Sequence, residues 1–101
     1  MNYISNGKYK NGLQKLRELS HMLEELEAKA ENIPAGQRHE IDTSSEKLDE
    51  KKRLIVLLMG QFEDAAPTER RDLKFEIDSD LEELGRGIEN LGEMIDKAEK
   101  K

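Results

Sequence analysis

Hydrophobic residues recur along most of this chain at alternating intervals of three and four, the spacing of amphipathic helices that pack along one seam. The pattern is uninterrupted in the last third of the chain, at Ile77, Leu81, Leu84, Ile88, Leu91, Ile95 and Ala98. It also runs through the first third, at Leu16, Leu19, Leu23, Leu26, Ala30 and Ile33. The sequence therefore predicts an all-α fold held by heptad seams.

The first helix is expected over about 12–32. Asn11, followed by Gln14 at the third position, suits the start of a helix because the two side chains can cap each other's backbone N–H groups. Pro34 disfavours the α conformation at the residue before it, and Gly36 follows. These two residues place the end of the helix.

The second and third helices have their own start signals. Thr43 with Glu46 three residues later matches a capping box, which predicts a helix over about 44–64. Pro67 suits a first helical turn, and the third helix is expected over about 68–99. The 34–42 stretch is then a long linker.

Linker and helix lengths predict the topology. The short second linker forces an antiparallel hairpin, and the long first linker lets the first helix return beside it. We predict a self-associating antiparallel three-helix coiled-coil bundle, with residues 11–101 as one domain and residues 1–10 as a loose N-terminal arm. The third helix spans roughly 45 Å against roughly 30 Å for the others, so its far end should be poorly covered. The alternatives are two long helices with a detached middle segment, or a dimer that completes a larger bundle.

The composition agrees with a thin core, and it argues against disulfides, a membrane span and a nucleic-acid partner. Of the 101 residues, 35% are hydrophobic and 40% are charged, against roughly 45–50% and 25% in average domains. Cysteine is absent, which suits a cytoplasmic protein and excludes disulfides. No signal peptide is visible, and the longest apolar run, 54–59, is far shorter than the roughly 20 residues of a membrane span. A net charge of −6 makes nucleic acid an unfavourable partner.

Candidate chemistry is sparse. Glu18 and His21 have the Glu-x-x-His spacing of di-iron bundles, but the seam places both side chains away from the core. His39, Glu40 and Asp42 lie together in the predicted linker and lack a second wall of ligands. We therefore expect no catalytic residue, no metal, no cofactor and no small-molecule substrate.

Two short basic clusters, 51–53 and 70–71, are each flanked by acidic residues. Such mixed charge is typical of solvated helix faces with ion pairs one turn apart. A nucleic-acid footprint would need a one-sided basic stripe. Neither cluster is therefore expected to bind nucleic acid.

The apolar run 54–59 goes all the way around a helix, so its members cannot all face one seam. If Leu58 faces the core with Ile55, then Leu54 and Leu57 point outward. Either this helix is the buried middle of the bundle, or the two leucines form an oligomer or partner surface. We favour the second interpretation and name Leu54, Leu57 and Leu58 as interaction residues.

Three glycines, Gly85, Gly87 and Gly92, interrupt the third helix, and each costs about 1 kcal/mol relative to alanine. Gly85 and Gly92 share one stripe beside the seam, where bare backbone permits close approach of another helix. The alternative is a kink or break at Gly85. We favour close packing, name Gly85 and Gly92 as interaction residues, and expect alanine at either site to destabilise the protein.

These features together predict a helical protein–protein interaction module, such as an adaptor, small chaperone or regulatory subunit, without catalytic activity. Its expected partners are itself, as a dimer or larger, and another helical protein. The alternative function is a small acidic inhibitor or decoy that occludes a basic site on a larger complex. Binding led by shape would survive moderate salt, whereas binding led by charge would weaken steeply.

Overall fold

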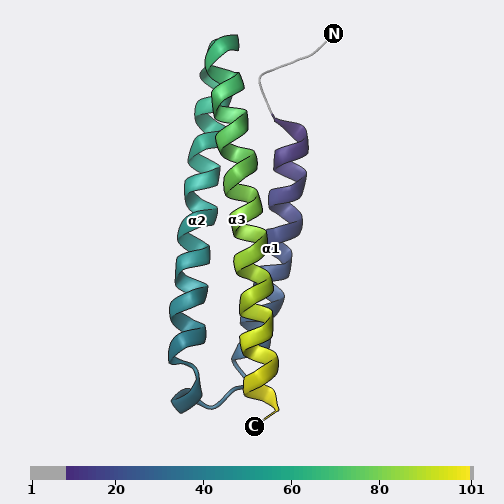
Figure 1. The fold of residues 1–101 in the computed structure, drawn as a ribbon, viewed down its shortest axis with the longest axis vertical. Coiled ribbons are helices and arrows are strands. Elements are labelled where there is room, and N and C mark those ends of the chain that lie inside the picture. The colour runs from purple at the N-terminus through teal and green to yellow at the C-terminus, as the bar shows by residue number, and fades with distance from the viewer. Residues whose placement is uncertain (1–8, 101) are drawn as a thin grey trace.

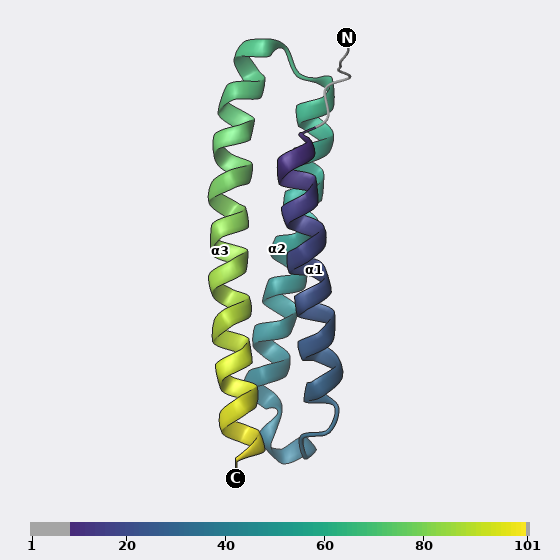
Figure 2. The ribbon, with the colours of Figure 1, turned by 90° about the vertical axis from the view of Figure 1, so that its right-hand side faces the viewer.

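The computed structural model describes residues 9–100, and this part of the chain is all-helical (Figure 1). Its long helices are α1 (Lys10–Ala30), α2 (His39–Asp64) and α3 (Pro67–Glu99), and a short 3-10 helix, η1 (Ala35–Gln37), lies between α1 and α2. Successive long helices run in opposite directions and pack side by side in a body of 54 × 20 × 15 Å (Figures 1 and 2). The predicted all-α class with three antiparallel helices is confirmed, and α2 is not a detached segment.

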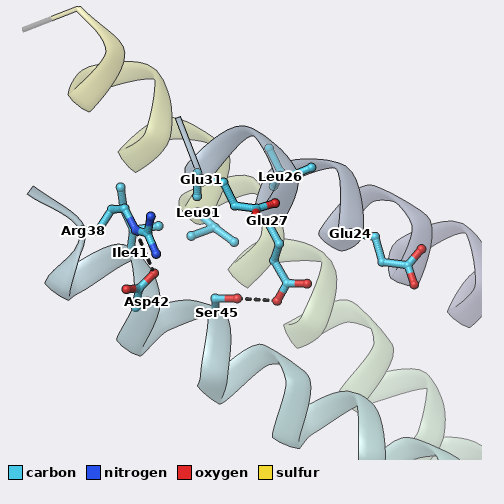
Figure 3. Close-up of a pocket in the computed structure, with 11 residues that line it drawn as sticks. Glu24, Leu26, Glu27, Glu31, Arg38, Ile41, Asp42, Ser45 and Leu91 are labelled. Carbon is cyan, nitrogen blue, oxygen red and sulfur yellow. Dashed lines mark hydrogen bonds and ion pairs between the residues drawn. The ribbon is translucent and has the colours of Figure 1, made fainter. Parts of the chain in front are cut away.

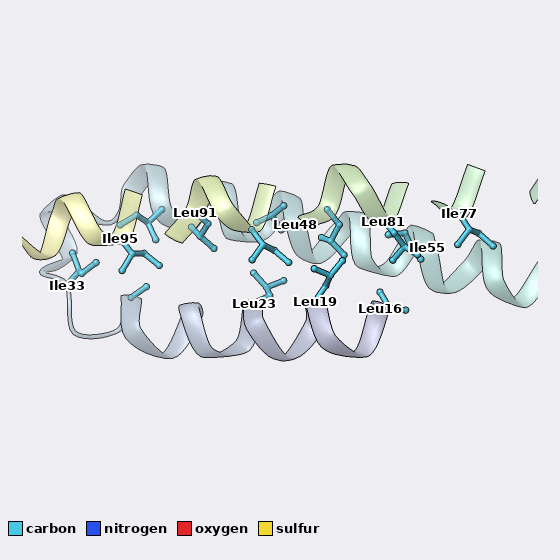
Figure 4. Close-up of a cluster of buried hydrophobic side chains, with 14 residues drawn as sticks. Leu16, Leu19, Leu23, Ile33, Leu48, Ile55, Ile77, Leu81, Leu91 and Ile95 are labelled. Atoms are coloured by element: carbon cyan, nitrogen blue, oxygen red, sulfur yellow. The ribbon is translucent and has the colours of Figure 1, made fainter. Parts of the chain in front are cut away.

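The core is one line of mainly leucine and isoleucine side chains between the three helices (Figure 4). α3 supplies six of them, each at most 1% exposed: Ile77, Leu81, Leu84, Ile88, Leu91 and Ile95. The rest of the chain supplies Leu16, Leu19, Leu23, Ala30, Ile33, Ile41, Leu48 and Ile55. α3 packs against both other helices, while α1 and α2 contact each other less. The seams predicted for the first and third helices therefore meet in the core.

α2 begins at His39, well before the predicted start at 44. The Thr43 hydroxyl donates to the His39 carbonyl at 2.9 Å, one turn back within the helix, so the predicted capping box is wrong. The reason for the longer helix is Ile41, which is only 3% exposed. Ile41 lies one heptad before Leu48, and Leu48 one heptad before Ile55, so an earlier start places one more side chain in the core.

α1 begins at Lys10 and has no side-chain cap at Tyr9, so the predicted cap at Asn11 is wrong. The Tyr9 hydroxyl donates to the Asp78 carboxylate at 2.7 Å, and its ring lies 5.7 Å from the Phe62 ring. Burial, reinforced by Asp78, raises the pKa of Tyr9 to about 12. Tyr9 and Lys10 thus belong to the bundle, and the rest of the predicted arm, 1–8, lies outside the described residues.

The far end of α3 is covered, contrary to prediction. Ile95 is fully buried, because the early start of α2 brings Ile41 to this end of the core. The thinner end is the opposite one, where the α2–α3 hairpin extends past the first turn of α1 (Figure 2). Phe75, in the part of α3 that follows this hairpin, is 78% exposed.

Arg70 ties the hairpin together. Its Nε and one terminal guanidinium nitrogen donate to the carbonyls of Phe62 and Glu63, each at 3.0 Å, and these carbonyls belong to the last turn of α2. The guanidinium also lies 5.5 Å from the centre of the Phe62 ring. Interpreting Arg70 as part of a solvated basic face is therefore wrong, whereas Arg71 is exposed as expected.

Replacing Arg70 with lysine should lower the melting temperature. A lysine ammonium cannot present two parallel N–H donors and stack on a ring at once, and each lost hydrogen bond removes about 0.5–1.5 kcal/mol. Arg71→Lys is the matched control, since Arg71 makes no hydrogen bond or ion pair with any of the residues 9–100. Thermal unfolding of the two variants checks this, and equal melting temperatures would contradict the role of Arg70.

Candidate functional site

The outer face of α2 carries two neighbouring exposed leucines. Leu54 is 56% exposed and Leu57 is 63% exposed, while Ile55 on the opposite side is fully buried. Leu58 is half-buried and packs against the edge of the core. The predicted outward direction of Leu54 and Leu57 is confirmed. The alternative, in which this helix is the buried middle of the bundle, is wrong.

The leucines belong to a longer pattern that the sequence analysis missed. Six exposed residues follow one another at spacings of 3-4-3-4-3 along α2: Lys47, Glu50, Leu54, Leu57, Gln61 and Asp64. We call this set the outer stripe. The spacing is that of a second heptad seam, and it was legible in the sequence. Only two of its six members are apolar, so a search for apolar residues at heptad spacing does not find this seam.

The charged members of the outer stripe have no ionic partner among residues 9–100, whereas Lys51 beside them does. Lys51 Nζ lies 2.6 Å from Glu83 Oε1 and 3.8 Å from Asp80 Oδ1, which ties α2 to α3. The hydrogen bond to Glu83 raises the pKa of Lys51, and the same bond lowers the pKa of Glu83. Lys51 is thus engaged within the bundle, while the stripe faces away from it.

The other exposed apolar side chains do not belong to the outer stripe and do not enlarge the apolar pair Leu54 and Leu57 along it. Val56, 53% exposed, is on α2 but lies off the stripe. Met22 on α1 and Phe75 on α3 belong to other helices. Single exposed apolar side chains are ordinary on protein surfaces. The pair Leu54 and Leu57 is distinguished by its position in the middle of a regular stripe.

Gly85 and Gly92 do not line a tight contact within the bundle. A methyl group at Gly85 would lie 3.7 Å from Leu19 Cδ2, and one at Gly92 would lie 3.8 Å from the Leu26 methyls, which is ordinary van der Waals separation. The predicted close packing of these two glycines inside the bundle is wrong, because leucine side chains of α1, not its backbone, fill the space. The predicted alternative of a break is also wrong, since α3 is one continuous helix.

Of the three glycines in α3, Gly87 is the one at which an added methyl group would clash. A methyl group there would overlap Leu48 Cδ2 on α2. Relieving this overlap requires the Leu48 side chain, which is 7% exposed, to move within the core. Because Gly87 has no side chain, Leu48 of α2 can pack directly on the backbone of α3. Close helix packing of this kind was predicted for Gly85 and Gly92.

Alanine at these glycines should change stability in opposite directions. Gly85→Ala and Gly92→Ala should each stabilise the protein by up to about 1 kcal/mol, because helix propensity improves without a clash. Gly87→Ala should destabilise it, because overpacking typically costs about 1–3 kcal/mol. Urea unfolding of the three variants measures both signs, and a gain at Gly87 or a loss at Gly92 would contradict the packing described.

A polar hollow of about 380 Å³ lies between α1 and α2, with Leu91 of α3 among its lining residues (Figure 3). Across it the Ser45 hydroxyl donates to the Glu27 carboxylate. Burial raises the pKa of Glu27, and Asp49 adds to this effect while the Ser45 hydrogen bond opposes it. The hollow thus contains a carboxylate that binds a proton more readily than usual and that links the two helices.

Glu27 should make stability depend on pH. The raised pKa means that the folded protein holds the Glu27 proton more tightly than the unfolded chain does. The protonated side chain therefore contributes stability below the ordinary pKa of 4.5, and this contribution is lost as the pH rises through the raised pKa of the folded state. Glu27→Gln should remove this loss, so its melting temperature relative to wild type should increase between about pH 4 and about pH 7. Glu24→Gln, at an exposed site on α1, is the control. A constant difference for Glu27→Gln would contradict the assignment.

The residues considered for metal or acid–base chemistry are spread over the surface. Glu18 and His21 are exposed, and His21 lies 3.8 Å from Glu25 one turn later. His39 and Asp42 lie in the first turn of α2, not in a loop. Among residues 9–100, the structure gathers no three histidine or carboxylate side chains into a possible metal site.

No family model matches the chain, and neither a curated protein nor a solved structure is significantly similar to it. Across residues 9–100, none of the helices has the length and hydropathy of a transmembrane segment. The outer stripe of α2, with two exposed leucines at its centre, is the best-defined candidate site, and its geometry is the basis for the function considered next.

Proposed function

We propose that this protein is a helical protein–protein interaction module, acting as an adaptor, small chaperone or regulatory subunit, and that it binds helices through the outer stripe of α2 by coiled-coil packing. The observation that carries the proposal is the exposure of Leu54 and Leu57, one turn apart, at 56% and 63%. Exposed leucines at heptad spacing are the knobs that a second helix accepts. The role requires no catalytic residue, and the proposed place of action is the cytoplasm.

The energetics support a docking role of moderate strength. Complete burial of a leucine is worth about 1.5–3 kcal/mol relative to full exposure, so covering two half-exposed leucines contributes only part of an association energy. Polar members of the stripe supply the remaining contacts and limit which helices fit. We therefore expect a reversible, specific interaction and not a permanent one.

Shape favours this function over the acidic decoy. A decoy needs a concentrated acidic surface, whereas the outer stripe carries, in order, a lysine, a glutamate, two leucines, a glutamine and an aspartate. The apolar centre of the stripe would keep its binding energy in moderate salt, since screening acts on charges and not on buried leucines.

A photo-crosslinking amino acid in place of Leu57 should give crosslinked products in native cells, at least several-fold more than the same amino acid in place of Val56. Val56 is similarly exposed on the same helix but lies off the stripe. Mass spectrometry of the product shows whether a second copy or another protein was bound. Equal yields at the two positions would contradict the proposed function.

A further inference from the structure

We propose that the outer stripe of α2 binds the outer stripe of a second copy of this chain, with the two α2 helices antiparallel and Leu54 facing the partner's Leu57. This inference rests on the proposed function, because it names the occupant of the same surface. Figure 1 shows α2 at the edge of the body, with α1 and α3 both to one side of it. All six residues of the outer stripe are exposed in the part of the chain that the structure describes, so a second helix can reach them.

The antiparallel pairing follows from the order of residues in the stripe. When Leu54 faces Leu57 of the partner subunit, two-fold symmetry repeats the same contact in reverse, and four leucines form the centre of the interface. One turn outward, Glu50 meets the partner's Gln61, an acceptor facing an amide donor. At the outer ends, Lys47 meets the partner's Asp64, which pairs opposite charges. The stripe is thus complementary to itself when reversed.

Other alignments lose this complementarity. A parallel pair would place Lys47 on Lys47, Glu50 on Glu50 and Asp64 on Asp64, so like charges would meet on both sides of the leucines. An antiparallel pair shifted by one heptad would place Leu54 or Leu57 against a charged residue. Polar and charged residues within a helical seam commonly determine orientation and register in this way. Only the stated register joins the leucines and pairs the lysine with the aspartate.

A glycine beside the stripe fits the same arrangement. Gly60 is exposed, and a methyl group placed there would have no neighbouring atom within 4 Å. In the proposed register Gly60 lies near the partner's Arg53, a long side chain that needs space next to the seam. Arg53 has no ion pair with any of the residues 9–100. Bare backbone at Gly60 leaves room for it.

Single-cysteine variants test orientation and register directly, because the chain has no cysteine of its own. In the antiparallel dimer, residue 47 of one chain meets residue 64 of the other, whereas the two copies of residue 47 are about 25 Å apart along the helix. Mixing Lys47→Cys with Asp64→Cys under mild oxidation should give a disulfide-linked heterodimer. Neither variant alone should crosslink, and Ser79→Cys, at an exposed site on α3, should crosslink with neither. Crosslinking of each variant with itself would show a parallel pair and overturn the proposal.

Charge reversal provides a second test that needs no crosslink. Lys47→Glu or Asp64→Lys alone should weaken self-association about tenfold, because each creates two repulsive layers per dimer. The double variant should recover the wild-type association constant to within about threefold, since opposite charges meet again. A parallel pair would not recover, because like charges still face each other. Light scattering between about 1 µM and about 1 mM measures the association constant.

The results separate this inference from the proposed function. Crosslinks from position 57 to a different protein, with a chain that stays at 11.6 kDa throughout the concentration range, would overturn the self-pairing and leave the interaction module standing. A dimer that depends on Leu57 but shows no rescue by the double reversal would overturn the stated antiparallel pairing and leave self-association through the stripe standing. Disulfide formation only in the mixture, with rescue by the double reversal, would establish both.

Discussion

Six side chains on α3 are each at most 1% exposed, and the rest of the molecule is arranged around them. α1 and α2 pack on this one apolar line and contact each other much less. Because only 35% of residues are hydrophobic, each helix has little more than the stripe needed to cover its share of the line. Few apolar residues therefore lie outside the core-facing side of each helix. Leu54 and Leu57 are two of these few, because neither contributes to the core.

Polar contacts then decide how the helices are placed along the core. Arg70 joins the start of α3 to the last carbonyls of α2, and the Tyr9 hydroxyl joins the start of α1 to Asp78 on α3. Lys51 links α2 to α3 through Glu83, and Ser45 links α2 to α1 through Glu27. A uniform leucine and isoleucine seam tolerates sliding by a heptad, whereas these contacts exist in only one alignment. None of these contacts involves a residue of the outer stripe of α2.

The sequence was sufficient for the parts of the fold that depend on periodicity. The seam positions on α1 and α3, the three helices and the outward direction of Leu54 and Leu57 all follow from spacing. The start of α2 does not follow from spacing or local signals. Thr43 and Glu46 match a capping box, but the burial of Ile41 in the core outweighs this local preference. The roles of Arg70 and Gly87 depend on which side chain of another helix lies opposite, which spacing along one helix does not contain. The outer stripe was visible in the sequence only when charged residues were counted as seam members.

Self-pairing through the outer stripe links these observations, and small-angle X-ray scattering over a range of concentrations tests it most directly. In the antiparallel pair the two-fold axis lies between Leu54 and Leu57, about four residues from the middle of α2, so the two bodies are offset by about 12 Å. The mass should double from 11.6 kDa while the longest dimension grows by only about 12 Å relative to the dilute protein. A longest dimension that nearly doubles, or a mass that stays at one chain at every concentration, would contradict the account.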